Sequence, residues 1–368
     1  MGRMFAFEAK RMGYTVVVLD PTPDCPASQV SDSQIVGSLF DGEAIRKLAQ
    51  ATDVLTFEFE HLDADILCSL GEQGYKIRPS GRTLKLIQDK FVQKLLFKES
   101  GLPVPEFVKA RDLSEAKVAL RHLGYPLMLK SCTGGYDGKG NAYVECEADL
   151  EKAWANLYNG KNEIMAEEFI PFEREISVVA ARGADGSVCL FPIAENTHSD
   201  NILKMTKAPA DISEQVRLKA QAIAGKVLDI FGDVGVFCVE MFLTREGNIF
   251  INEVAPRTHN SGHFTIEGCV TSQFEQHLRA ITGMPLGSAR QLKPAVMVNI
   301  LGQSLIPNSF KIKGIEKMLK EEEVYFHFYG KRFIDSNKKI GHITALADSI
   351  EIAEKKALDA LFSIDITE

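Results

Sequence analysis

The stretch Val236–His263, which reads VFCVEMFLTREGNIFINEVAPRTHNSGH, decides the fold. Within it, two apolar runs flank the short polar segment Thr244–Asn248. Two apolar runs joined by a short polar segment with a glycine predict a β-hairpin. We place the turn of this hairpin near Glu246-Gly247, because glycine accepts the backbone angles that tight turns require.

The hairpin brings two carboxylates together. If the turn is centred between Glu246 and Gly247, Glu240 and Glu253 become cross-strand partners with Cβ atoms about 4.5–5.5 Å apart, whereas a bulge at Gly247 would shift the pairing by one residue. Carboxylates this close repel each other, and a divalent cation removes the conflict. Their oxygen atoms suit Mg²⁺, which also takes substrate phosphates. The alternative is two solvated surface glutamates, but their apolar neighbours favour the metal.

A polar loop, Ala255–His263, directly follows the second strand of the hairpin. It holds an arginine, two histidines, an asparagine and a serine within seven residues. Pro256 ends the strand, and Gly262 permits a tight bend. Because the loop lies at a strand end beside a candidate metal, we expect it to bind an anion.

Composition and charge exclude several classes of protein. The chain has 368 residues, enough for two or three domains, and a net charge of −8, which argues against a nucleic-acid-binding surface. No run approaches the roughly 18 apolar residues of a transmembrane helix, and we expect no signal peptide. The seven cysteines form no C-x-x-C motif. We therefore expect free thiols in a cytoplasmic protein, without zinc or disulfides.

The first hundred residues alternate between helices and strands, which predicts a parallel sheet. The expected elements are a helix over 1–13, strands Thr15–Leu19 and Gln34–Val36, a helix over Gly42–Gln50, a strand over Val54–Phe57 and a helix over Thr83–Ser100. A doubly wound sheet normally begins with a strand and a glycine-rich turn. Because Met1-Gly2-Arg3 resembles the tail of such a turn, we expect the first strand to be missing and the short chain to be unstable and slow to turn over.

Acidic residues follow the expected strand Val54–Phe57. Glu58 and Glu60 would point to one face at the carboxyl end of this strand, where open α/β sheets bind ligands. A solvated strand end is the equal alternative. Further along, Gly101-Leu102-Pro103-Val104-Pro105 is the clearest linker and places a domain boundary near residue 100.

A glycine-rich loop lies between two expected strands of the second domain. The strands cover Leu127–Lys130 and Ala142–Glu145, and four of the seven loop residues 134–140 are glycine. Backbone N–H groups of such a loop can approach phosphates without obstruction by Cβ atoms. The loop lacks the P-loop pattern, but Lys130 at the end of the preceding strand could reach a phosphate.

The remaining chain alternates strands and helices up to a second boundary near residue 290. Beyond it we expect a strand over Val296–Leu301, a hairpin over Val324–Leu346 and a helix over Ile350–Leu361. This part is too small to bury a large core alone, so we expect it to pack on the rest. The hairpin turn carries four cations, and on its own it is better interpreted as a solvated tip: Lys331, Arg332, Lys338 and Lys339.

Several motifs in one order resemble the ATP-grasp superfamily, and within it the N5-carboxyaminoimidazole ribonucleotide synthetase family of purine biosynthesis. The motifs are QDK at 88–90, GGYDGKG at 134–140, EEFI at 167–170, FERE at 172–175, PRTHNSGH at 256–263 and TSQFEQH at 271–277. The resemblance implies an α/β and α+β fold with three parts. These are a Rossmann-like N-terminal domain (1–100), which lacks its first strand and the family's Gly-Gly-Gly-Gln-Leu turn, a two-lobed ATP-grasp domain (101–290) and a small β-rich C-terminal domain (291–368).

The resemblance also implies how ATP and a metal would be held. Lys90 and Lys130 would hold the phosphates, beneath the loop containing Gly134, Gly135, Tyr136, Gly138 and Gly140. The backbone of Glu167, Glu168, Phe169 and Ile170 would bind adenine, Glu175 the ribose, and His198 would line the nucleotide site. Glu240 and Glu253, with Asn252 beside them, would hold Mg²⁺ or Mn²⁺.

The implied substrates are aminoimidazole ribonucleotide and bicarbonate, which is activated by ATP as carboxyphosphate. Arg257, His259 and Asn260 would position bicarbonate. The ribonucleotide would contact Glu58, Tyr136, Asp137 and Lys139, with Lys331 and Lys338 on its 5′-phosphate and Asp137 a candidate base. A cytoplasmic homodimer is expected. The alternatives are another ATP-grasp ligase, such as the formate-using glycinamide ribonucleotide transformylase, and a non-catalytic ATP-binding module.

Overall fold

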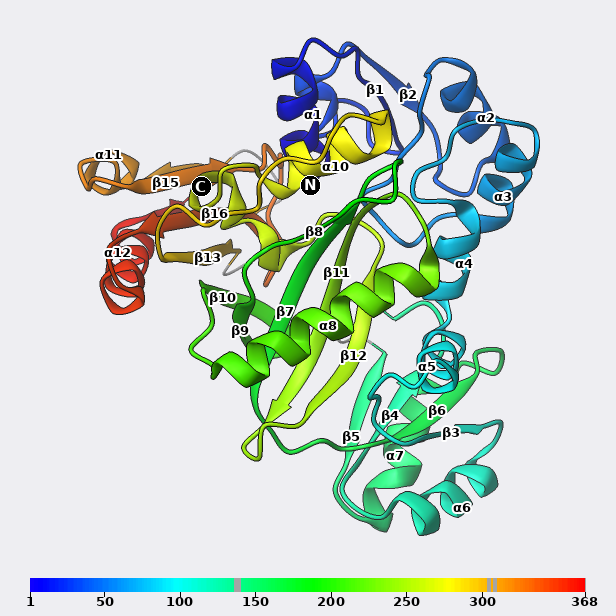
Figure 1. Cartoon of the computed structure of the whole chain (residues 1–368). Coiled ribbons are helices and arrows are strands. Elements are labelled where there is room, and N and C mark those ends of the chain that lie inside the picture. The colour runs from blue at the N-terminus through cyan, green and yellow to red at the C-terminus, as the bar shows by residue number, and fades with distance from the viewer. Residues whose placement is uncertain (136–139, 303–305, 307–309, 368) are drawn as a thin grey trace.

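The computed structural model describes residues 1–135, 140–302, 306 and 310–367. A nine-stranded sheet forms its centre, with the strand order β12-β11-β7-β9-β10-β13-β16-β15 and β8 paired to β7 (Figure 1). Its strands are β7 (Phe172–Arg182), β8 (Val188–Leu190), β9 (Ala194–Ser199), β10 (Ile202–Ala208), β11 (Gly235–Thr244), β12 (Ile249–Ala255), β13 (Ala295–Leu301), β15 (Val324–Phe328) and β16 (Lys339–Leu346). The predicted C-terminal segment therefore continues this sheet through the β10–β13 ladder.

The predicted hairpin forms as β11 and β12, and Glu240 lies opposite Glu253. The turn, however, is centred one half-residue earlier than predicted, because Leu243 pairs with Ile249 and Gly247 adopts φ +81°. A bulge between the pairs Met241–Ile251 and Glu240–Glu253 leaves Asn252 as the extra residue and shifts the register back. Two local irregularities thus cancel, which is why the predicted carboxylate pair survives.

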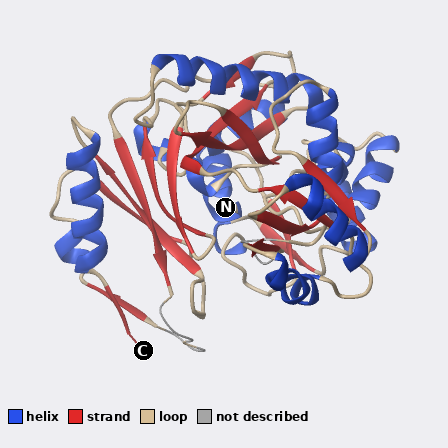
Figure 2. Cartoon of the chain, turned by 90° about the horizontal axis from the view of Figure 1, so that it is seen from below, coloured by secondary structure: helices blue, strands red, loops and turns tan. Residues whose placement is uncertain are grey.

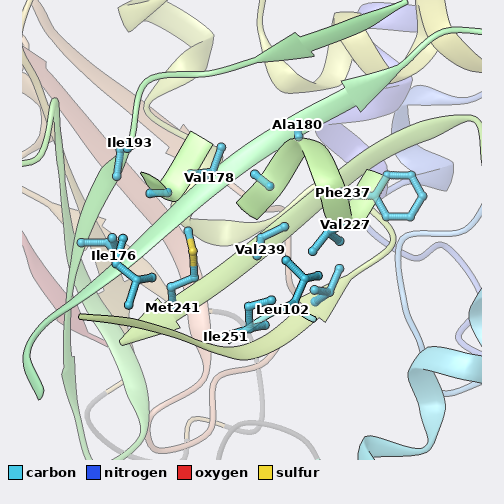
Figure 3. Packing of buried hydrophobic residues seen from close by; sticks show 14 of the residues in the cluster. Leu102, Ile176, Val178, Ala180, Ile193, Val227, Phe237, Val239, Met241 and Ile251 are labelled. Atoms are coloured by element: carbon cyan, nitrogen blue, oxygen red, sulfur yellow. The ribbon is translucent and has the colours of Figure 1, made fainter. Parts of the chain in front are cut away.

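One face of the hairpin is apolar and is covered by α8 (Glu214–Phe231), as Figure 3 shows. Ile176, Val178, Val239 and Met241 contribute to this core with negligible exposure. Because side chains alternate between the two faces of a strand, the intervening polar residues of β7 and β11 point to the opposite face. That opposite face carries the candidate site.

A smaller four-stranded sheet forms a second lobe, in the order β3-β6-β4-β5. Its strands are β3 (Phe107–Ala110), β4 (Leu127–Ser131), β5 (Asn141–Val144) and β6 (Ile164–Glu168), covered by α6 (Leu113–Leu123) and α7 (Glu147–Leu157). The antiparallel β4–β5 pair confirms the predicted hairpin around the glycine-rich loop. In Figure 1 this lobe lies beside β12, the outer strand of the hairpin, so β4, β6 and β12 can present side chains to one site.

The predicted helix over Thr83–Ser100 is wrong in one respect, because it is two helices. These are α4 (Gly81–Gln88) and α5 (Lys90–Glu99), separated by Asp89 with an extended backbone. Asp89 caps α5 by accepting hydrogen bonds from the N–H groups of Phe91 and Val92, which is favourable at a helix N-terminus. Lys90 is therefore the first residue of a helix, and its N–H donates to the carbonyl of Cys132.

The N-terminal region contains a two-stranded parallel sheet rather than the larger predicted one. Strands β1 (Val17–Asp20) and β2 (Ser33–Val36) pair, and they are accompanied by α1 (Gly2–Arg11), η1 (Ser28–Val30), α2 (Gly42–Gln50) and α3 (Ala64–Glu72). The predicted strand Val54–Phe57 is not formed, since only Leu55 makes a parallel bridge, to Ile77. Within the described residues no strand pairs with the other side of Leu55, so the ladder does not extend.

The remaining elements frame the large sheet. They are η2 (Asn260–Gly262), α9 (Thr265–Gly268), α10 (Gln273–Thr282), α11 (Ile315–Met318), α12 (Ile350–Ser363) and the small sheet of β14 (Lys311–Lys313) and β17 (Asp365–Thr367). In Figure 2, α12 covers the C-terminal strands on the side away from the other domains. None of the helices in the described part of the chain is long and apolar enough to cross a membrane.

Candidate active site

The two carboxylates of the hairpin have different electrostatic surroundings. Burial and the neighbouring Glu253 raise the pKa of Glu240 to about 8. Lys90 places its Nζ 2.8 Å from Oε2 of Glu253 and lowers the pKa of that carboxyl to about 2. The pair therefore carries one firmly held negative charge, and a second would require an additional cation.

The donor set at this pair fits a hard divalent cation. Glu240, Glu253 and the amide oxygen of Asn252 provide oxygen atoms, the ligands that Mg²⁺ prefers. The described residues contain no cluster of three or more acidic, histidine or cysteine side chains that could hold a metal alone. Magnesium commonly completes its shell with substrate phosphates and water, so two carboxylates facing a nucleotide site are sufficient.

A buried carboxylate joins two lysines deep in the site. Glu167 on β6 accepts from Nζ of Lys130 at 2.5 Å through Oε1, and its Oε2 lies 2.8 Å from Nζ of Lys94. All three side chains are buried, and Lys130 also donates to Asn252 Oδ1 at 3.2 Å. Burial raises the pKa of Glu167, but the two lysines outweigh burial and lower it overall. The triad thus links the small lobe to α5 and to the hairpin.

Lys94 should make protein stability depend on pH. Burial, against the attraction of Glu167, lowers its pKa from 10.5 to about 8. Between these two values the unfolded chain binds the proton more tightly, so the free energy of unfolding should rise with pH by about 3 kcal/mol from this group. Urea unfolding at pH 8 and pH 10.5 measures the slope, and the Lys94→Met variant should lack that component. If the free energy of unfolding of Lys94→Met rises with pH as steeply as that of the wild-type protein, the lowered pKa of Lys94 is wrong.

His198 and Glu175, which the resemblance assigns to the nucleotide site, lie together on the polar face of the sheet. Nδ1 of His198 on β9 is 3.1 Å from Oε2 of Glu175 on β7. Burial lowers the pKa of His198, but Glu175 outweighs burial and raises it overall. Glu168 of the predicted adenine segment accepts from the N–H of Glu106 at 3.3 Å, which fixes the strand that precedes Phe169 and Ile170.

The polar loop after β12 brings Arg257 to the acidic residues of the N-terminal region. Nε of Arg257 is 3.2 Å from Oε1 of Glu60, while Glu58 lies 3.0 Å from the amino group of Met1. Burial lowers the pKa of Arg257, yet Glu60 and Glu58 outweigh it. Glu60 thus contacts Arg257, whereas the side chain of Glu58 is 49% exposed and lies beside the amino group of Met1. A ligand-facing position for this pair, rather than a solvated strand end, stays a prediction.

His259 and Asn260 occupy fixed positions in the same loop. Nε2 of His259 is 3.8 Å from Oε2 of Glu240, and burial together with Arg257 holds the pKa of His259 well below its usual value. The side-chain amides of Asn260 and Asn299 exchange two hydrogen bonds, of 3.1 and 2.7 Å. The imidazole is therefore neutral, and the loop is tied to β13.

Comparison with known proteins decides the family. Three family models match in the order of the domains: the ribonucleotide synthetase preATP-grasp domain over residues 1–88, the ATP-grasp domain over 95–274 and the phosphoribosylaminoimidazole carboxylase C-terminal domain over 295–356. The N5-carboxyaminoimidazole ribonucleotide synthase of Bacillus subtilis is 42% identical over 348 residues, which cover 94% of this chain and 88% of that protein.

The chain belongs to the N5-carboxyaminoimidazole ribonucleotide synthase family.

Solved structures of the same family agree with this placement. The N5-carboxyaminoimidazole ribonucleotide synthetase of Thermotoga maritima is 43% identical, with a TM-score of 0.90 and coverage of 100% of this chain and 96% of that one. The enzyme of Aspergillus clavatus, in complex with ADP and 5-aminoimidazole ribonucleotide, is 34% identical, with a TM-score of 0.88 and coverage of 98% and 96%. The chain is thus an ATP-dependent ligase with an ATP-grasp fold.

The glycine-rich loop of this family member is only partly described. Tyr136, Asp137, Gly138 and Lys139, which the sequence assigns to the ATP and substrate sites, lie outside the described residues. At the base of the loop, a Cβ atom on Gly140 would lie 2.9 Å from Cα of Gly135, closer than real Cβ contacts allow. Gly134 adopts φ +75°. The base of the loop therefore favours glycine at Gly134, because of its backbone angle, and at Gly140, because of its close contact.

The cationic turn of the C-terminal hairpin reaches the N-terminal region. Arg332 forms an ion pair with Asp24, and Gln29 donates to the carbonyl of Gly330 at 3.2 Å. Nζ of Lys338 lies 3.9 Å from the ring centroid of Phe333. The turn is thus fixed against another domain and is not an isolated solvated tip, although the roles of Lys331 and Lys338 remain predictions.

Lys94 is the main site residue that sequence reasoning missed. It follows Lys90 by four residues, so the two lysines lie on the same face of α5, a spacing that is visible in the sequence. The partner of Lys94 is not visible there, because Glu167 is 73 positions away and belongs to the segment predicted to bind adenine through its backbone. The signal in the sequence that could have pointed to Lys94 is its position four residues after Lys90, next to a linker.

Proposed function

We propose that this chain carboxylates 5-aminoimidazole ribonucleotide to N5-carboxyaminoimidazole ribonucleotide, using ATP and bicarbonate and releasing ADP and phosphate. The observation that supports this most is the meeting of Glu240 and Glu253 with Lys90, Lys130 and Arg257 at one place between two lobes. The site offers cations for phosphates, carboxylates for a metal and an arginine for a small anion. The chain also aligns over more than nine tenths of its length with relatives named for this ribonucleotide product or solved with its precursor.

Each charged group has a definable part in the reaction. Lys130 and Lys90 bind phosphate oxygens of ATP, and Mg²⁺ held by Glu240 and Glu253 supplies further positive charge to the transferring phosphoryl group when it is bound. Arg257 and the neutral His259 orient bicarbonate for attack on the γ-phosphorus. Charge that develops on the transferring oxygens is stabilised by these fixed cations, which need no reorganisation. The remaining contacts, Asn260 to bicarbonate, Glu175 to ribose and 167–170 to adenine, are proposed as predicted.

The ribonucleotide is proposed to bind between the N-terminal and C-terminal regions. Glu58, which is close enough to Arg257 to help raise its pKa, would face the ribonucleotide, and Lys331 and Lys338 would offer cations for the 5′-phosphate. Asp137 and Lys139 of the glycine-rich loop would approach the amine, with Asp137 as the proton acceptor. Domains 1–100, 101–290 and 291–368 would then each contribute to one substrate site. We also propose a homodimer that works in the cytoplasm, in keeping with the free cysteines.

Substitution of Lys338 tests the 5′-phosphate assignment. Lys338→Ala should raise the KM for aminoimidazole ribonucleotide about tenfold, because one charge-assisted phosphate contact is lost, and should leave the KM for ATP unchanged. Lys317→Ala, which removes a charge from α11 in the same domain, is the matched control. An unchanged KM for the ribonucleotide in Lys338→Ala would remove Lys338 from the substrate site.

The reaction itself is tested by following ADP release while the co-substrates are varied. Release should require the ribonucleotide and bicarbonate together, and the carboxylated product should form in equal amounts. Formate serves as the control, because the glycinamide ribonucleotide transformylase alternative would use it as acyl donor. ADP release that depends on formate, or that proceeds without any ribonucleotide consumed, would reject the proposal.

A further inference from the structure

A chain of buried hydrogen bonds crosses the large sheet and ends on His259. Thr206 on β10 donates to Oδ1 of Asn196 on β9 at 2.9 Å, and Nδ2 of Asn196 donates to Oγ of Ser177 on β7 at 2.8 Å. Ser177 donates to Oγ of Ser261 at 3.0 Å, and Ser261 lies 2.8 Å from Nδ1 of His259. The other four members of this chain are all buried, with exposed fractions between 0% and 6%: Thr206, Asn196, Ser177 and Ser261.

Two groups in this chain can only donate, and they set its direction. The backbone N–H of Ser261 points at Nδ1 of His259 at 3.3 Å, so Nδ1 must carry a lone pair. The amide nitrogen of Asn196 likewise can only donate, so the hydroxyl hydrogen of Ser177 is directed to Ser261. The hydroxyl hydrogen of Ser261 then goes to Nδ1 of His259 at 2.8 Å, a stronger acceptor than Sγ of Cys238 at 3.5 Å. An imidazole whose Nδ1 accepts a hydrogen bond carries its ring hydrogen on Nε2, which here is the nitrogen that faces Glu240.

We infer that Thr206, Asn196, Ser177 and Ser261 are positioning residues that hold His259 as the Nε2–H tautomer, so that it offers a hydrogen-bond donor, and no base, to the reacting anions. We call this chain of hydrogen bonds from Thr206 to His259 the relay. Its role in the reaction rests on the proposed function, which places His259 in the active site. It gives His259 one function, to donate to a carboxylate, carbonate or phosphate oxygen. It also assigns the proton released by the substrate amine to another group.

The location of the relay explains how it reaches the chemistry. Ser177 is the register partner of Glu240 in the β7–β11 ladder, so the two side chains lie on the same face. A shift of Ser177 or Ser261 would therefore move His259 relative to the candidate metal ligand. Partners one step removed from a site typically change activity about 10–100-fold when they are lost, without touching the substrate.

Nitrogen NMR of the histidine rings in the full chain tests the tautomer directly, without substrate. The His259→Gln variant identifies the His259 signals by their loss. In the wild-type protein Nδ1 should show the chemical shift of an unprotonated nitrogen and Nε2 that of a protonated one. The opposite tautomer would overturn the inference. This result is independent of which reaction the enzyme catalyses, so it separates the relay from the proposed function.

Substitution of Ser177 tests the relay itself. Ser177→Ala removes the donor that directs the hydroxyl of Ser261, so it should shift the Nδ1 resonance of His259 and lower kcat about tenfold with the KM for ATP unchanged. Ser177→Thr should restore the resonance and most of kcat. Thr344→Val removes an equally buried hydroxyl that has no hydrogen-bond partner among the described residues, and it should change neither the Nδ1 resonance of His259 nor kcat. If Ser177→Ala retains both the wild-type Nδ1 resonance and the wild-type kcat, the relay does not position His259.

Discussion

Glu253→Gln should abolish magnesium-dependent ADP formation, with a loss of roughly 10³-fold in kcat or more, while ATP binding stays measurable. The reason is the charge balance of the hairpin. Glu253 is the carboxylate that stays ionised, since Lys90 lowers its pKa to about 2, whereas burial and Glu253 raise that of Glu240 to about 8. Removing the ionised member leaves a weak metal site. ATP binding by fluorescence and ADP release by a coupled assay measure the two effects separately.

Glu246→Gln is the matched control for this experiment. Glu246 lies at the exposed tip of the same hairpin, so the same change of charge should leave ADP formation intact. The two variants differ in one further respect, because Glu253→Gln also removes the ion-pair partner of Lys90. Wild-type turnover by Glu253→Gln at ordinary Mg²⁺ would contradict the metal assignment, whatever the effect on Lys90.

Glu167→Gln should be the most destabilising single substitution in the site, costing about 3–5 kcal/mol in the free energy of unfolding. Glu167 neutralises two buried lysines at once, with contacts of 2.5 Å to Lys130 and 2.8 Å to Lys94. Without the carboxylate, both buried ammonium groups lose the negative charge that contacts them directly. Urea unfolding monitored by circular dichroism gives the free energy directly.

Two further variants make this prediction specific. Glu106→Gln removes the partner of Lys98 in an exposed pair and should cost less than about 1 kcal/mol, because solvent screens such pairs. The double variant Lys94→Met with Glu167→Gln should be more stable than Glu167→Gln alone. In the double variant the ammonium group of Lys94, which Glu167→Gln leaves buried without its partner, is no longer present. Equal stability of Glu167→Gln and Glu106→Gln would show that the triad does not stabilise the fold.

The central hairpin could be predicted because its information is local. Alternating polar and apolar residues in β11 and β12, with a glycine in between, determine which residues face each other. The bulge at Asn252 was not predictable in the same way, and the pairing of Glu240 with Glu253 was correct because the turn shift and the bulge cancel. The polar loop after Pro256 was also predictable, since its residue types and its position at a strand end are both visible in sequence.

The errors arose where distant partners decide the structure. The apolar spacing continues through Asp89, but the N–H of Lys90 bonds to the carbonyl of Cys132, and Asp89 instead caps the second helix. Val54–Phe57 has strand composition, yet a strand needs neighbours along its length, and only Leu55 has one. The Lys94–Glu167 contact and the relay to His259 likewise join segments that sequence alone leaves unrelated.

Transfer of labelled oxygen from bicarbonate tests the central claim most directly. If bicarbonate attacks the γ-phosphorus of ATP in this site, turnover with ¹⁸O-bicarbonate and aminoimidazole ribonucleotide should place one bicarbonate oxygen in each phosphate released, in step with formation of the carboxylated ribonucleotide. Mass spectrometry of the phosphate and of the ribonucleotide follows both products in one reaction. Phosphate that carries no label, formed while ADP accumulates, would contradict the account.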